Sequence, residues 1–84
     1  MSGIEILGYV AGTISTIVFL PQVIKTWKTK SAKDISLLMF VFATTSVVLW
    51  LIYGLLIKNG SIIYTNSCIL VLSLVMLYFK VKYK

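Results

Sequence analysis

The 84-residue chain is 60% hydrophobic and only 12% charged, which excludes an ordinary soluble domain of this size. Its formal net charge of +6 does not indicate nucleic-acid binding, because the eight lysines lie between and after the apolar stretches and form no basic face. Three apolar helices and their loops use up the length, so we expect one membrane domain over residues 1–84 and no soluble catalytic domain.

The first apolar stretch, from about residue 4 to residue 24, is long enough to cross a bilayer as a helix. The residues before it lack the basic start of a signal peptide, and Glu5 places an acid there instead. We therefore expect a retained membrane helix.

Pro21 interrupts this helix in its inner third, because it cannot donate a hydrogen bond to the carbonyl of Ile17. The resulting kink is either static, with the freed carbonyl satisfied by neighbours, or a moving hinge. The adjacent Gln22, whose amide can bond to the freed backbone or across helices, favours the hinge.

Small residues at Gly8, Gly12 and Thr16 recur every four positions along the same stretch. Such a series either lets a second helix approach closely or leaves room for a cavity.

The second apolar stretch runs from about residue 37 to residue 57, and Asp34 and Ser36 offer side chains that can cap its start. Five side chains recur at three- and four-residue spacing on one face of this stretch: Met39, Phe42, Ser46, Trp50 and Tyr53. A stripe of this kind more often serves packing than a solute pathway.

The third stretch runs from about residue 61 to residue 79, with Ser61 as a candidate cap. It contains Asn66 and the single cysteine, Cys68, which we expect to be a small packing residue. The chain has no histidine and no metal-ligand spacing, so we expect no metal and no cofactor.

Trp50 and Asn66 lie at similar depth, roughly 7 to 10 Å below the outer boundary, where an indole or a side-chain amide is unusual. A flat apolar ring beside an amide that both donates and accepts suits a sugar, because pyranose rings present C–H faces and hydroxyl edges. Core packing is the alternative for Trp50, and interhelical hydrogen bonding is the alternative for Asn66.

The distribution of lysines predicts the orientation in the membrane. Seven flank the inner ends of the stretches, at positions 25, 28, 30, 33, 80, 82 and 84, whereas Lys58 alone lies in the other loop. The positive-inside rule then places the amino terminus outside and the carboxyl terminus in the cytoplasm.

The interiors of the three stretches contain no Asp, Glu, Lys, Arg or His. The one acid within their bounds, Glu5, lies at the outer edge of the first stretch. Ion-coupled carriers use such groups to bind the driving ion, so passive movement of a neutral solute fits better. Three helices cannot enclose a pocket for a sugar-sized molecule, and we expect a parallel two-fold homodimer with the pathway on its axis.

The sequence resembles the SemiSWEETs, the bacterial half-size relatives of the SWEET sugar transporters, which carry the PQ-loop signature. The resemblance covers nearly the whole chain. It is carried by the segments at residues 8–11, 19–23, 29–36 and 49–54, and by Asn66.

The resemblance implies a homodimer of all-α three-helix bundles packed in the order one, three, two. It also implies passive transport of mono- or disaccharides, glucose-like or sucrose-like, by alternating access in the bacterial inner membrane. On the residues that match, it assigns Trp50 and Asn66 to the sugar, Pro21 and Gln22 to the hinge, Phe19 to the inner gate and Tyr53 to the outer gate. The remaining candidates for the pocket lining are Gly12, Thr16, Met39 and Ser46.

One departure concerns the outer gate, where relatives often pair an arginine with an aspartate. Here the positions hold Ile57 and Asn59. We therefore predict outer closure through packing of Tyr53, with less dependence on salt than an ion pair gives.

Two rival functions remain: a PQ-loop carrier of another small solute, such as an amino acid, and a small pore or structural subunit. A zwitterion would call for charged or half-helix groups that these stretches lack. Saturable uptake with counterflow separates a carrier from a pore. An enzyme is not expected, because no nucleophile, base and orienting group can be assembled here.

Overall fold

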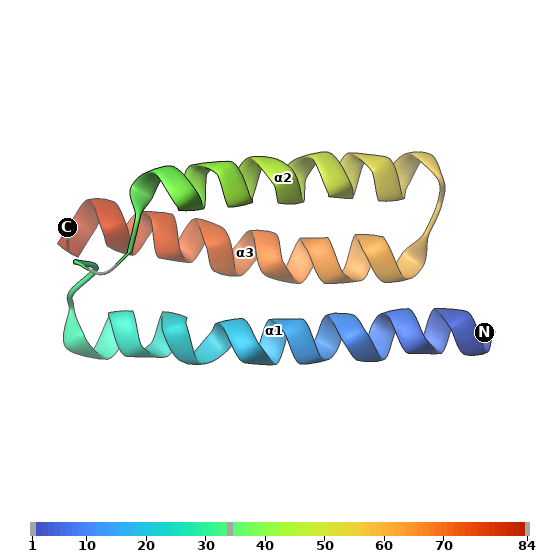
Figure 1. Cartoon of the computed structure of the whole chain (residues 1–84), viewed down its shortest axis with the longest axis horizontal. Coiled ribbons are helices and arrows are strands. Elements are labelled where there is room, and N and C mark those ends of the chain that lie inside the picture. Colours follow the sequence, from blue (N-terminus) through green and yellow to red (C-terminus); the bar gives the residue numbers. More distant parts are fainter. Residues whose placement is uncertain (1, 34, 84) are drawn as a thin grey trace.

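The chain forms three helices joined by two short connections, and the computed structural model describes residues 2–33 and 35–83 (Figure 1). Helix α1 spans Gly3–Thr29, α2 spans Leu37–Leu56 and α3 spans Gly60–Tyr83. Each is long and apolar enough to cross a hydrocarbon core of about 30 Å. The predicted all-α fold with three membrane helices is confirmed, and the chain is a multi-pass membrane protein.

Serine side chains begin the first two helices. Ser2 Oγ accepts a hydrogen bond from the Glu5 amide at 3.1 Å, and Ser36 Oγ accepts one from the Met39 amide at 3.2 Å. Capping of this kind satisfies backbone donors that have no partner inside the helix. Helix α1 continues past residue 24 and ends only at Thr29, where Lys30 takes a left-handed conformation with φ of 51°.

The start of α3 corrects one prediction, because Asn59 and not Ser61 caps this helix. Asn59 Oδ1 accepts a hydrogen bond from the Ile62 amide at 3.1 Å. Ser61 lies inside the first turn and donates its hydroxyl to the same Oδ1 at 2.8 Å. The left-handed residue of the turn is Lys58, with φ of 55°. Asn59 and Gly60 are therefore the cap and the first residue of α3.

Helix α3 lies between α1 and α2 and packs against both (Figure 1). The packing order one, three, two is therefore confirmed. The molecule measures 43 × 21 × 14 Å. Its long dimension matches a bilayer with its headgroups, and its short dimension is little more than the width of one helix with side chains.

Two glycines bring the outer helices close to α3. A methyl group at Gly12 would overlap the side chain of Thr65, and one at Gly54 would lie 2.6 Å from a methyl carbon of Ile62. Both glycines are buried. The small residue at position 12 thus permits close helix approach, one of the two uses predicted for the series.

The connection between α1 and α2 is attached to the far end of α3. Lys80 Nζ donates a hydrogen bond to the carbonyl of Ala32 at 2.9 Å, and the Ile35 amide donates to the same carbonyl at 3.1 Å. Ala32 itself is buried. These contacts fix the connection over the end of the bundle where most lysines lie.

Candidate solute-binding site

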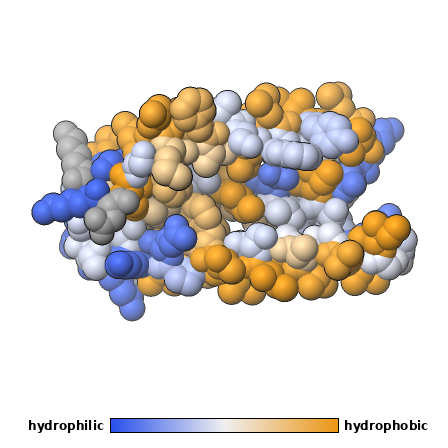
Figure 2. Space-filling model, in the orientation of Figure 1, coloured by the Kyte–Doolittle hydropathy of each residue, from blue (hydrophilic) through white to orange (hydrophobic). Residues whose placement is uncertain are grey.

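An open groove of about 270 Å³ lies between α1 and α3 in the half of the molecule that holds the amino terminus. In Figure 2 the surface is hollowed between α1 and the other two helices in this half, and hydrophilic residues show inside the hollow. Apart from one isoleucine, small or polar residues line the groove: Gly8, Ala11, Gly12, Ser15, Ser61, Ile62, Thr65 and Asn66. The groove holds no charged side chain, so it suits a neutral solute.

Asn66 lies in this groove, half-buried, with part of its hydrogen-bonding capacity unused. Its Nδ2 donates to the Ile62 carbonyl of the same helix at 2.9 Å. Within the described part of the chain, the amide makes no hydrogen bond to another helix. An amide has two N–H groups and a carbonyl oxygen, so one donor and the acceptor remain for a ligand or for a second chain.

Trp50 lies on α2 and is 52% exposed within one chain. Its ring meets that of Tyr53 edge to face, with the centroids 5.6 Å apart. The two rings line a shallow depression of about 280 Å³ together with Ser46 and Leu49. Inside a single chain Trp50 therefore belongs to an open aromatic surface, and about half of the residue is accessible to a ligand or a second chain.

Trp50 and Asn66 lie at the same level in adjacent helices, although they line different pockets. Trp50 is six residues before Leu56, the last residue of α2, and Asn66 is six residues after Gly60, the first of α3. At 1.5 Å per residue each is about 9 Å from the turn that joins the helices. One chain thus supplies two parts of a site at one depth without enclosing it.

Phe19 connects α1 to α2 further along the bundle. Its ring meets that of Phe40 edge to face at a centroid distance of 6.0 Å. The α1 and α2 backbones, within the described residues, are otherwise held apart by α3. This ring pair is a hydrophobic contact between the groove and the lysine-rich end.

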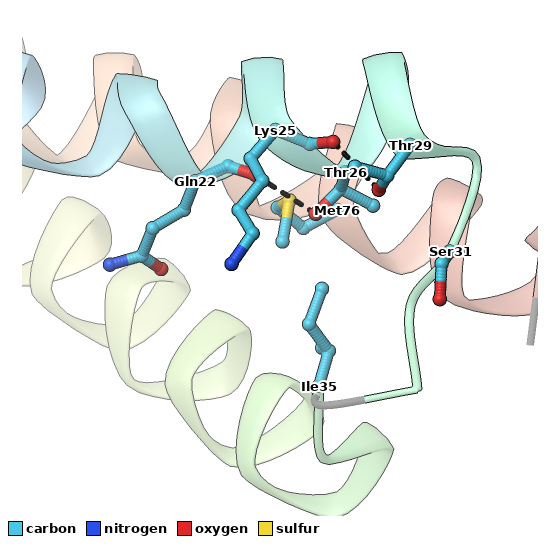
Figure 3. A pocket seen from close by; sticks show the side chains of 7 residues that line it. All are labelled: Gln22, Lys25, Thr26, Thr29, Ser31, Ile35 and Met76. Atoms are coloured by element: carbon cyan, nitrogen blue, oxygen red, sulfur yellow. Dashed lines mark hydrogen bonds between the residues drawn. The ribbon is translucent and has the colours of Figure 1, made fainter.

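Pro21 does not end α1, which continues as one helix from Gly3 to Thr29. Beyond it a second depression of about 300 Å³, here called the inner cavity, opens near the lysine-rich end (Figure 3). The inner cavity is lined by Gln22, Lys25, Thr26, Thr29, Ser31, Ile35 and Met76. Gln22 thus lies in a cavity wall, and α1 is continuous at the proline beside it.

The remaining predicted lining residues are dispersed. Gly12 lines the same groove as Asn66, and Ser46 lines the same aromatic depression as Trp50. Met39 is exposed on α2 outside both, and the Thr16 hydroxyl donates to the Gly12 carbonyl of its own helix at 2.9 Å. No cluster of metal ligands occurs among residues 2–33 and 35–83.

Two polar residues of the groove, Ser15 and Thr65, were not among the candidates predicted from the sequence. Ser15 follows Ala11 by one helical turn, so the α1 residues of the groove recur at three- and four-residue spacing. This spacing of small residues was a signal in the sequence for Ser15. Thr65 precedes Asn66 and faces Gly12, a pairing that only the structure shows.

Comparison with known proteins places these features in a family. Residues 3–63 match the model of the PQ loop repeat. The protein named Sugar transporter SemiSWEET from Bradyrhizobium diazoefficiens is 41% identical over 80 residues, which cover 95% of this chain and 93% of that protein.

Solved structures agree with the sequence match. The crystal structure of a bacterial homologue of SWEET transporters superposes with a TM-score of 0.90 at 40% identity, over 95% of this chain and 96% of the other. That of SemiSWEET in the inward-open conformation superposes with a TM-score of 0.88 at 30% identity, over 96% of this chain and 87% of the other.

Proposed function

The chain belongs to the SemiSWEET family of PQ-loop proteins, a family of transporters and not of enzymes, and we propose that it carries sugars across the membrane. The proposed mode is uniport of a mono- or disaccharide, glucose-like or sucrose-like, with no coupled ion. The groove and the aromatic depression contain no charged residue that could bind a driving ion or the two charges of an amino acid.

The observation that carries the proposal is that an exposed indole and an amide with unused hydrogen-bonding capacity lie at one depth in adjacent helices. Trp50 offers a ring face to the C–H surface of a pyranose, and Asn66 offers a donor and an acceptor to its hydroxyls. Within the described chain, about half of Trp50 is exposed and the Asn66 amide uses one of its donors only. A neutral polyol matches both at once, whereas an apolar solute would leave the amide without a partner in a low-dielectric site.

The complete site requires a second copy of the chain. The molecule is only 14 Å thick in its shortest dimension, and the groove and the depression are both open. A sugar must be surrounded to be held away from lipid. A parallel two-fold dimer would close the site and place two copies each of Trp50 and Asn66 around it.

Transport by alternating access would use the two aromatic contacts as gates. Phe19 lies on the inner side of the groove in contact with Phe40, and Tyr53 lies nearer the outer end of α2 in contact with Trp50. Pro21 lies two residues beyond Phe19, where the missing backbone donor makes α1 easiest to bend. Bending there would separate or join the inner ends while the sugar site stays in place.

The protein would lie in the cytoplasmic membrane of a bacterium with its amino terminus outside. Lys25, Lys28, Lys30 and Lys33 lie at one end of the bundle, which is also the end where α3 finishes. The opposite turn carries Lys58 alone. This asymmetry favours a cytoplasmic location for the lysine-rich end.

The test is counterflow of labelled glucose into liposomes by the Trp50→Ala variant. Removal of the ring should reduce saturable counterflow roughly 5- to 150-fold, because stacking of a flat face on an aromatic ring contributes on the order of 1–3 kcal/mol. Trp27→Ala is the matched control, since Trp27 is the other tryptophan, is 58% exposed and lies on α1 away from the groove.

Full counterflow in Trp50→Ala would exclude a stacking role. Flux that does not saturate and shows no counterflow would indicate a pore. Counterflow of a labelled amino acid without competition by sugars would indicate the rival carrier.

A further inference from the structure

The inner cavity differs chemically from the groove because it contains a cation. Five of its seven lining residues are polar, and Lys25 is the only charged one. Figure 3 shows the side chains of Gln22 and Lys25 extending from α1 toward the side where Ile35 lies. The cavity volume of about 300 Å³ is at the lower end of small-molecule sites.

The hydroxyl protons of two threonines in the cavity are already used. Thr26 Oγ1 donates to the Gln22 carbonyl at 2.9 Å, and Thr29 Oγ1 donates to the Lys25 carbonyl at 2.8 Å. The donors that remain on the α1 wall are the Lys25 ammonium and the Gln22 amide, whereas Ser31 lies on the opposite side of the cavity (Figure 3). No acidic side chain among residues 2–33 and 35–83 lines the cavity. An ammonium group beside a neutral amide donor is a ligand set for an oxyanion.

The cavity also lies where anions concentrate. Gln22 follows Ser15 by seven residues, two helical turns, so the cavity and the groove open on the same face of α1. The Phe19–Phe40 contact lies between them. Lysines surround the cavity end of the bundle, and their summed field raises the local concentration of negative ligands.

We propose that the inner cavity binds a phosphoryl group, with Lys25 as its main ligand and Gln22 as a further donor. A phosphorylated hexose, inorganic phosphate and a phospholipid headgroup share this chemistry. A hexose phosphate held here would stop at the inner end of the pathway, because the groove contains no cation to receive its charge. This consequence for transport rests on the proposed function, whereas the binding does not.

The test is calorimetric titration of the purified protein in a phosphate-free detergent with glucose 6-phosphate, inorganic phosphate and glucose. Lys25→Gln should weaken binding of both phosphoryl ligands about tenfold or more, since it removes a charge-assisted hydrogen bond. Lys28→Gln is the matched control because Lys28 is exposed on the same helix and does not line the cavity. It should change the affinity less than twofold.

A second arm identifies the source of the phosphoryl group. Repeating the titration in phosphatidylglycerol nanodiscs should leave glucose 6-phosphate binding intact if the ligand is soluble, and should remove it if the headgroup is the occupant. Either result supports the cavity as a phosphoryl site. No binding in detergent, or an equal loss in Lys25→Gln and Lys28→Gln, would overturn it.

Glucose counterflow separates this inference from the proposed function. Counterflow without phosphoryl binding overturns the phosphoryl site alone. Phosphoryl binding without counterflow of any sugar overturns the sugar carrier alone.

Discussion

At the scale of single residues, the two side chains proposed to bind sugar both keep unused capacity for a ligand within the described chain. Asn66 bonds only within its own helix in the described structure, and Trp50 is half exposed. The sequence predicted both residues as sugar contacts because an amide and an indole are unusual at that depth. It did not predict that they line two different pockets, because this depends on the rotation of each helix about its axis.

Pro21 allows a test of the proposed hinge. In Pro21→Ala the new N–H can donate to the Ile17 carbonyl, which adds one helical hydrogen bond and stiffens α1. We expect exchange between inward-open and outward-open forms to slow about three- to tenfold, the effect of a bond of about 1 kcal/mol, with sugar affinity nearly unchanged. Single-molecule distance measurements between labelled inner ends of α1 in the dimer give the rate.

Leu20→Ala is the control for this variant, since Leu20 is an exposed neighbour of the proline with an ordinary backbone. Equal losses of exchange rate and of sugar affinity in Pro21→Ala would point to a packing role for the proline.

At the scale of the helices, close packing of α1 against α3 depends on Gly12. A methyl group there overlaps the Thr65 side chain, so Gly12→Ala should destabilise the folded chain by about 1–3 kcal/mol, the usual cost of overpacking. Unfolding in mixed micelles measures the change. Gly3→Ala is the matched control because open space surrounds Gly3 at the start of the same helix.

Thr65→Ala removes most of the overlapping atoms and should restore much of the stability lost in Gly12→Ala. If the two substitutions simply add, with no energetic coupling between them, then the contact at Gly12 does not limit the approach of the helices.

Helix number followed from apolar length, because only a helix satisfies its own backbone in lipid. The ends did not follow for α1 and α3, which continue past the apolar stretches to Thr29 and Tyr83. The central place of α3 followed from the family resemblance and not from any amphipathic stripe. Residues 61–70 are all half-buried, so every face of this segment contacts protein in part. No face of the segment is therefore marked as the lipid-facing side. The capping by Asn59 was missed because serine and asparagine are both good caps and lie two positions apart.

At the scale of the whole molecule, the flat shape explains why one chain is not the proposed transporting unit. Large apolar side chains are exposed on α1 and α2, among them Ile14, Val18, Leu49 and Tyr53. In a membrane these face lipid or another protein chain. A second copy would cover part of this surface and would turn two open half-sites into one enclosed cavity.

The most direct measurement uses the fact that the chain has only two tryptophans. Trp27→Phe leaves Trp50 as the sole indole, so its emission reports contact with glucose. The variant is reconstituted at increasing lipid dilution, and the dimer fraction is counted by single-molecule photobleaching. We predict that the glucose-induced change in emission falls in proportion to the dimer fraction and vanishes in monomers. Monomers that respond with the same affinity, or dimers that do not respond, would contradict a sugar site shared between two copies.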